Sequence, residues 1–188
     1  MRNLLRAAFL FASILAMNTA FAQTVVLFGV DGLKLGDYPQ GMALANSFSM
    51  GFVDNTTTVQ STTAAGTASR GTVPGQRSIQ DIVLTLPTGN ATIMLSRAVM
   101  AGTPFPRATI QITQANKNQN PPIFQVMVYD VLVTSVVMGK SGNDGGPGFT
   151  EVKLKGSRYD MFNNSMGPTG QMVPGAKAGF DVRAGKVY

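Results

Sequence analysis

The sequence predicts a mainly β protein, built as a small closed β-barrel of two packed antiparallel sheets with one flanking α-helix. Three observations predict this fold. About seven or eight runs of the chain are apolar and rich in β-branched residues, a strand number that small barrels use. Turn residues such as Gly, Pro, Asn and Asp separate these runs. A single segment, by contrast, has its apolar residues at helical spacing.

An export signal is predicted at residues 1–22. Arg2 and Arg6 form a short positive region, and Ala7–Met17 is an apolar stretch. Ala20–Ala22 then has the small-x-small pattern that signal peptidase reads. The apolar stretch is shorter than the roughly 20 residues that a membrane-spanning helix needs. We therefore expect cleavage, a periplasmic or extracellular location, and no membrane contact after cleavage.

The remaining residues, 23–188, are expected to form one domain, because their number lies within the ordinary domain size range. Residues 55–76 are rich in Thr, Ala, Gly and Ser and have few apolar side chains to bury. They predict a long flexible loop. Residues 163–188 are expected to form a C-terminal tail rich in Gly and Pro.

The strands before the helix are expected at Thr24–Val30, Asn46–Asp54 and Ser78–Leu86. The first is a β-branched run that ends at the turn pair Asp31-Gly32. The second alternates apolar and small residues, which is typical of a strand with one buried face. The third is again apolar, and the sequence Pro-Thr-Gly follows it as a stop.

One helix is expected from Asn90 to Ala101. Its apolar residues recur at the i, i+3, i+4, i+7 spacing of a single helix face, at Ala91, Met94, Leu95, Ala98 and Ala101. Either Thr88 or Asn90 is a suitable N-cap. Gly102 suits the left-handed residue that closes a helix, and the prolines that follow prevent continuation.

After the helix, strands are expected at Arg107–Gln114, Ile123–Met138 and Phe149–Phe162. The middle run is too long for one flat strand and is apolar on both faces. We expect a bend or bulge near Tyr129-Asp130, which would let the strand turn a corner between sheets.

The composition argues against an enzyme. The chain has no His and no Cys, which removes the commonest general base and the thiolate nucleophile, along with the commonest metal ligands. We expect no cofactor and no metal. Removal of Arg2 and Arg6 leaves 13 Lys and Arg residues (15 minus 2) and 9 acidic residues, which gives a net charge of +4. These basic residues are scattered, so no nucleic-acid surface is expected.

Charged residues make up only 13% of the chain, against about 25% in typical soluble domains. A surface with so few charges protects a small domain weakly against self-association. One interpretation is an ordinary extracellular surface. The other is that much of this surface is buried in an assembly.

A set of motifs in fixed order resembles a known family. These motifs are LFGVDGLKLGDY, NSFSMG, GQRSIQDIVLTL, NATIMLSRAVMAGTPFPRATIQI, FQVMVYDVLVTSVVMGKSG, TEVKLKGSRYD and GFDV. Together they resemble the Hcp family, the haemolysin-coregulated tube proteins of type VI secretion. The positions that match its motifs are Asp31, Gly32, Gln80, Asp81, Asp130, Val131, Gly179, Phe180 and Asp181.

The resemblance implies a barrel flanked by a helix, six subunits in a ring, rings that stack into a tube, and no catalysis. The expected partners are further copies of this chain, with secreted effectors or other secretion components. Contacts between stacked rings are expected in the loop at residues 55–76. The candidate positions are Thr56, Thr57, Thr58, Gly66, Arg70 and Gly71.

Two other hypotheses stay open at this point. An export signal is not part of the family's pattern, so an exported relative could form rings or filaments outside any contractile machine. A third hypothesis is a monomeric exported binding module. Such a module needs an exposed aromatic platform or a polar pocket. The chain has no Trp, and its aromatic residues, 8% of the chain, mostly lie at apolar strand positions, which argues against this hypothesis.

Overall fold

The computed structural model describes residues 24–54, 57–62, 68–73, 77–114, 122–140, 148–167 and 172–188. The predicted export signal lies outside these residues. The elements in chain order are β1 (Thr24–Val30), η1 (Pro39–Gly41), β2 (Ala43–Ala45), β3 (Ser47–Ser49), β4 (Phe52–Asp54), β5 (Thr57–Thr62), β6 (Ala68–Val73), β7 (Arg77–Ile79), β8 (Ile82–Pro87), α2 (Asn90–Ala101), β9 (Phe105–Gln114), β10 (Phe124–Gly139), β11 (Phe149–Lys155), β12 (Arg158–Met166), β13 (Met172–Asp181) and β14 (Lys186–Val187).

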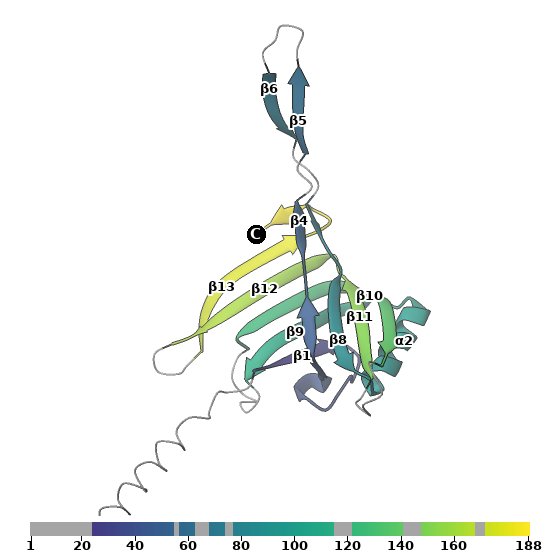
Figure 1. Ribbon diagram of the computed structural model, residues 1–188. Coiled ribbons are helices and arrows are strands. Elements are labelled where there is room, and N and C mark those ends of the chain that lie inside the picture. Colours follow the sequence, from purple (N-terminus) through teal and green to yellow (C-terminus); the bar gives the residue numbers. More distant parts are fainter. Residues whose placement is uncertain are drawn as a thin grey trace, which may run out of the picture.

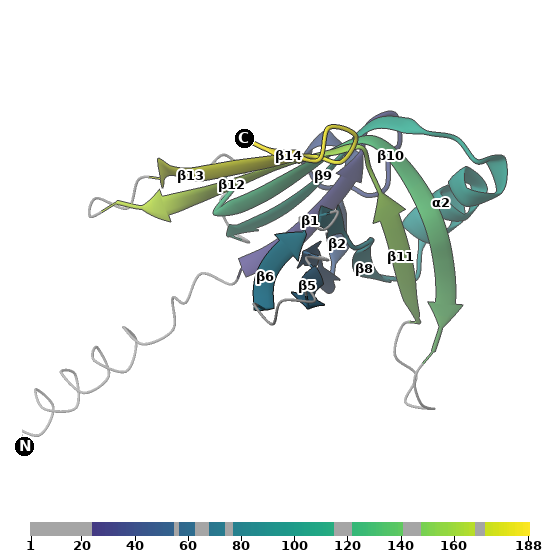
Figure 2. The same ribbon diagram turned by 90° about the horizontal axis from the view of Figure 1, so that it is seen from above.

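Two antiparallel sheets share the long strand β10 (Figures 1 and 2). The first half of β10 pairs with β9 on one side, as far as Val131, and with β12 on the other, as far as Tyr129. The second half, Leu132–Gly139, pairs with β11, which in turn pairs with β8. The prediction of a mainly β fold of two antiparallel sheets with one helix is therefore confirmed for the described residues.

The predicted bend in β10 is present. Asp130 has a φ of 50°, in the left-handed region that Asp tolerates better than most residues. The pairing with β11 also shifts register between Val133 and Ser135. These two irregularities let one strand leave the first sheet and enter the second.

The prediction of a closed barrel is wrong: no sheet of described strands closes on itself. β2 pairs with β1 in the first sheet, whereas β3 pairs with β8 in the second. Asn46 separates these two three-residue strands and belongs to neither. Its N–H donates to the Thr85 carbonyl oxygen at 2.7 Å, so the two sheets meet there without one continuous ladder.

The helix α2 spans the predicted residues, and the face that carries mostly small side chains packs on the core. Its buried residues are Ala91, Thr92, Leu95 and Ala98. The predicted N-cap, Thr88 or Asn90, is wrong, because Gly89 is the N-cap. The Gly89 N–H donates to Thr92 Oγ1 at 3.1 Å. The closing residue is confirmed as Gly102, with a φ of 60°.

The core lies between the two sheets and under α2. Fully buried side chains come from strands of both sheets and from the helix, and include Phe28, Ile82, Leu84, Leu95, Ile110, Val126, Val128, Val152 and Leu154. Burial of side chains this large supplies the main favourable free energy of folding.

Two predicted strands are each divided in the structure. The run Phe149–Phe162 forms β11 and β12, which a turn at Gly156-Ser157 separates. A Cβ at Gly156 would overlap Val128 and lie 2.8 Å from the Tyr129 carbonyl oxygen, so the turn packs directly on β10. The run Asn46–Asp54 likewise forms β3 and β4, divided at Met50-Gly51.

The two segments predicted as loop and tail contain strands. Within residues 55–76, β5 and β6 pair from Thr57↔Val73 to Thr62↔Ala68, and Figure 1 shows this hairpin projecting beyond β4. Thr and Val favour extended backbone, and a two-stranded ladder satisfies backbone groups without an apolar face. Within residues 163–188, β13 and β14 extend the first sheet.

Candidate assembly surfaces

The motif positions Asp31 and Gly32 form the turn after β1. The Asp31 carboxylate makes an ion pair with Arg107, with 3.1 Å between Oδ2 and Nε and 3.4 Å between Oδ1 and Nη2. The Asp31 N–H also donates to the Arg107 carbonyl oxygen at 2.9 Å. Gly32 has a φ of 87°, which only glycine adopts readily. These two residues fix the turn against β9.

Gln80 and Asp81 join β7 to β8 on the other sheet. The Gln80 N–H donates to the Gly51 carbonyl oxygen at 2.9 Å, and its side chain fills the space beside Gly51. Asp81 accepts a hydrogen bond from Thr134 Oγ1 at 3.3 Å. This pair therefore ties the start of β8 to the second half of β10.

Asp130 occupies the bend of β10 and binds two groups from the C-terminal part of the chain. Its Oδ2 accepts a hydrogen bond from Ser157 Oγ at 2.5 Å and lies 3.6 Å from an Arg183 nitrogen. Both members of the ion pair are exposed, so the pair adds little stability. Val131, the next residue, is fully buried in the core.

Gly179, Phe180 and Asp181 form the end of β13. Phe180 is buried and lies opposite Tyr159, while Asp181 accepts a hydrogen bond from the Ala184 N–H at 2.9 Å. The structure brings this end of β13 close to Asp130, because Arg183 in the following turn reaches it. The pairs at Asp31 and at Gln80 lie elsewhere, so the motif positions do not form one site.

A polar cluster on the outer face of the first sheet was missed by the sequence reasoning. The Arg158 guanidinium lies 4.0 Å from the centre of the Tyr129 ring and donates to Asp160 at 3.1 Å. Tyr188 donates from its phenol to the same carboxylate. No local spacing signals this cluster, because its members come from β10, β12 and the residue after β14.

The cluster shifts three pKa values, and the hydrogen bonds that Arg158 makes to Asp160 and Tyr129 raise the pKa of its guanidinium. Burial alone would raise the pKa of Asp160, but hydrogen bonds from Tyr188, Arg158 and Tyr129 outweigh it and lower this pKa. Desolvation of the phenol, then the hydrogen bond to Asp160, raise the pKa of Tyr188 to about 12. The arrangement stabilises a carboxylate and a neutral phenol, which suits a structural contact.

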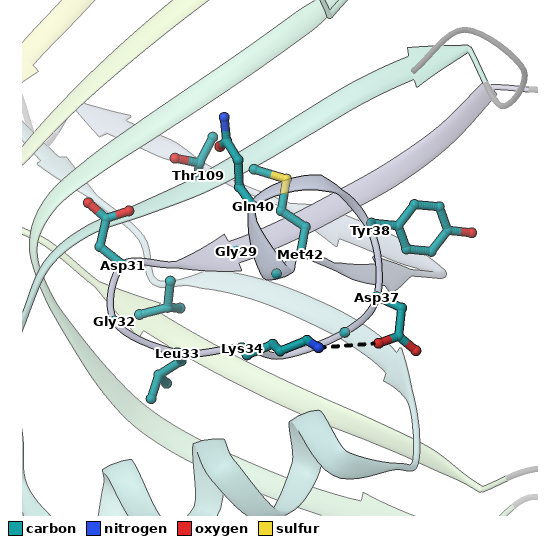
Figure 3. Close-up of a pocket in the computed structure, with 13 residues that line it drawn as sticks. Gly29, Asp31, Gly32, Leu33, Lys34, Asp37, Tyr38, Gln40, Met42 and Thr109 are labelled. Atoms are coloured by element: carbon teal, nitrogen blue, oxygen red, sulfur yellow. Dashed lines mark ion pairs between the residues drawn. The ribbon is translucent and has the colours of Figure 1, made fainter. Parts of the chain in front are cut away.

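An open hollow of about 500 Å³ lies beside the loop between β1 and β2 (Figure 3). Its rim carries an exposed ion pair, with 3.8 Å between Lys34 Nζ and Asp37 Oδ1. Asp31, also on the rim, is already paired with Arg107. Among the described residues, no three His, Cys, Asp or Glu side chains group as a metal site. None of the described helices has the length and hydropathy to span a membrane.

The second half of β10 has one side without a strand. β9 pairs with β10 only as far as Val131, and in the described ranges no other strand takes over on that side. The helix α2 packs against β10 on that side (Figure 1). We call Leu132–Gly139 the β10 edge. Three of its apolar side chains are exposed: Leu132 (40%), Val137 (52%) and Met138 (61%).

The fold and these surfaces define a two-sheet β protein with one packed helix and exposed apolar side chains along the second half of β10. The model of the family "Type VI secretion system effector, Hcp" matches residues 30–161. The chain therefore belongs to the Hcp family of type VI secretion, as its motifs predict.

Solved structures support the same fold. A structure titled as a type six secretion system protein is 15% identical, with a TM-score of 0.72 over 88% of this chain and 100% of that chain. Hcp1 from Salmonella typhimurium is 17% identical, with a TM-score of 0.64 over 88% and 99%. A chain of the anti-feeding prophage baseplate, 6-fold symmetrised, is 11% identical, with a TM-score of 0.54 over 77% and 95%. A search of curated proteins found no match.

Proposed function

We propose that this chain is a non-enzymatic structural subunit that assembles into hexameric rings, and that these rings stack into a tube for type VI secretion. The family match over residues 30–161 carries the proposal. The similarity to a chain of a six-fold baseplate also supports it, because that chain has the same fold in an assembly of that symmetry. The absence of His and Cys from the chain agrees with a role without catalysis.

The β10 edge supports self-association. Exposed apolar side chains that lie together without charges form a surface on which another chain can pack. Here the edge contains neither a charged residue nor a proline. A neighbouring subunit would cover it, and closure of the assembly into a ring limits growth in that plane.

The β5–β6 hairpin is the proposed contact between stacked rings. Thr57 and Thr58 lie on β5, and Arg70 and Gly71 lie on β6, where they pair with Gln60 and Val59. Thr56 and Gly66, the other two candidates, lie outside the described residues. An isolated two-stranded hairpin is marginally stable in water. A neighbour in the next ring would supply the third strand or face that this hairpin lacks.

The predicted export signal favours a second form of the same proposal. If residues 1–22 are cleaved in the periplasm, the rings or filaments form there or outside the cell, independently of a contractile machine. The partners are then further copies of this chain alone. Within a type VI machine, the partners also include secreted effectors and other secretion components.

Negative-stain imaging of residues 23–188 tests this function, with a matched variant in which a short Gly-Ser linker replaces Thr57–Val73. We expect six-fold rings and tubes from the first protein, and unstacked rings from the second. Tubes from both proteins would contradict the stacking role of the hairpin while leaving the ring proposal intact. A strict monomer from both would contradict the assembly and favour the exported binding module.

A further inference from the structure

We propose that the exported form of this chain carries a pyroglutamate, the lactam of an N-terminal glutamine, at Gln23. This inference goes beyond the proposed assembly and rests on the predicted cleavage after Ala22. Such a cleavage makes Gln23 the first residue of the mature protein. Gln23 lies directly before the described residues, so the strand that follows it, β1, supplies the structural support.

The reaction needs only groups that an N-terminal glutamine itself carries. The α-amino nitrogen, part of which is neutral near pH 7, attacks Cδ of the side-chain amide and forms a bond to it. The bond between Cδ and Nε2 breaks, and the amide nitrogen leaves as ammonia with a proton that the α-amino group gives up. Because the attack closes a five-membered ring within one residue, it needs no bimolecular encounter and no co-reactant. The product has lost the positive charge of the α-amino group.

The segments at the end of the first sheet where β1 starts have no acid in their sequences. Thr24 pairs with Gln114 at the end of β9, and the start of β10 and the end of β12 follow in the same sheet. Residues 112–124 and 161–175, which include these strand ends and the segments that join them to the next strands, contain no Asp and no Glu, whereas Lys117 is basic. These segments therefore offer a free α-ammonium no carboxylate, and the neutral lactam needs none.

The nearest acid in the register of this sheet is Asp160. Through β10 and β9 it lies in one row with Gly29, five residues beyond Thr24. At the usual rise of a strand, that is about 17 Å along β1. Asp160 is also already bound by Arg158 and Tyr188. A charge at the start of β1 would therefore gain little from this carboxylate, since exposed charges so far apart are largely screened.

The lactam would protect strand β1 from stepwise removal of residues at its start. β1 pairs with β9 over its whole length, from Thr24 to Val30, and places Phe28 and Val30 in the core. Only Gln23 separates the predicted cleavage site from this strand, and Thr24 is exposed. An aminopeptidase that removed Gln23 would next remove residues of the ladder. Such enzymes bind a free α-amino group, which the lactam does not have.

Mass spectrometry of the exported protein tests the modification. The full-length chain is expressed, purified from the periplasm, and measured at harvest and after prolonged incubation at neutral pH. The intact mass gives the cleavage site, and the tryptic peptide of residues 23–34 locates any loss of ammonia. Pyroglutamyl peptidase, which removes only the lactam, identifies it chemically. Gln23→Asn is the matched control, because it keeps a side-chain amide but would have to close a strained four-membered ring.

We expect the wild-type peptide to be lighter by one ammonia, and the protein to resist a broad aminopeptidase until pyroglutamyl peptidase has acted. The Gln23→Asn protein should be cleaved at the same site, keep its ammonia and lose residues to the aminopeptidase.

Unmodified Gln23 in both samples would overturn the proposal, and so would the same loss of ammonia in both proteins. Cleavage at another residue would overturn it but leave export intact, whereas an uncleaved chain would contradict the export signal as well. Light scattering of the same sample reports on ring formation independently of these outcomes.

Discussion

Tyr188 donates a hydrogen bond from its phenol to the carboxylate of Asp160 and so fastens the residue after β14 to the first part of β12. The backbone supports the same contact, because Gly179 and Tyr188 exchange two hydrogen bonds of 2.9 and 3.0 Å. A Cβ on Gly179 would overlap the Tyr188 ring, so glycine provides the space for it. The result is a closed C-terminal hairpin that covers the end of the β13 edge.

This contact predicts a tyrosine that titrates late. Desolvation and the hydrogen bond to Asp160 raise the pKa of Tyr188 to about 12, so the phenol stays neutral in the folded protein when an ordinary tyrosine has ionised. Its stabilising effect should be complete below about pH 10 and should disappear as the pH rises toward the folded-state pKa. Absorbance titration of tyrosinate in the wild type and in Tyr188→Phe measures this pKa by difference. A difference curve centred near 10 would contradict the contact.

The bend of β10 depends on a residue that accepts a positive φ. We expect Asp130→Val to destabilise the protein by about 1–3 kcal/mol, because a β-branched residue is strained in the left-handed region. Asp130→Gly removes the same carboxylate but accepts this φ, so it should cost clearly less. Urea unfolding of both variants separates backbone strain from the loss of the Ser157 and Arg183 contacts. Equal losses in the two variants would show that the contacts matter more than the bend.

The turn between β11 and β12 needs a residue without a side chain. At Gly156 a Cβ would overlap Val128 and lie close to the Tyr129 carbonyl oxygen, both in the rigid strand β10. We expect Gly156→Ala to lower the free energy of unfolding by about 1–3 kcal/mol. Gly89→Ala is the control, because nothing lies within 4 Å of its Cβ position. Its loss should be about 1 kcal/mol or less, because alanine is only a poorer N-cap than glycine and meets no overlap there. Thermal or urea unfolding compares them, and an unaffected Gly156→Ala variant would refute the packing.

The β10 edge should control assembly. A lysine at an exposed position keeps the monomer folded but places a charge where a neighbouring subunit would bury an apolar side chain. Val137→Lys is therefore expected to shorten or abolish tubes, with little change in the unfolding midpoint. Val173→Lys adds the same charge at a comparably exposed position on β13, away from the β10 edge, and its tubes should resemble those of the wild type. Sedimentation of assembled protein measures both, and equal tube yields would argue against a role for the β10 edge.

Features with local signals could be predicted from the sequence. The helix at Asn90–Ala101 follows from its apolar spacing and from Gly102. The bend at Asp130 follows from the length of an apolar run that no single flat strand accommodates. In both, the residues that determine the structure lie within one short segment of the chain.

Features that depend on distant residues could not be predicted. The run Phe149–Phe162 reads as one strand, since only its packing on Val128 shows why Gly156 must interrupt it. The low apolar content of residues 55–76 predicts a loop. Strands β5 and β6 form there because their backbones pair with each other. The contact between Asp160 and Tyr188 spans 28 positions, and no motif indicates it.

Light scattering coupled to size-exclusion chromatography, applied to residues 23–188 over a range of concentrations, tests whether this chain forms rings. We expect a discrete species with the mass of six subunits, with larger stacks as the concentration rises. A species with the mass of one subunit at every concentration would contradict it.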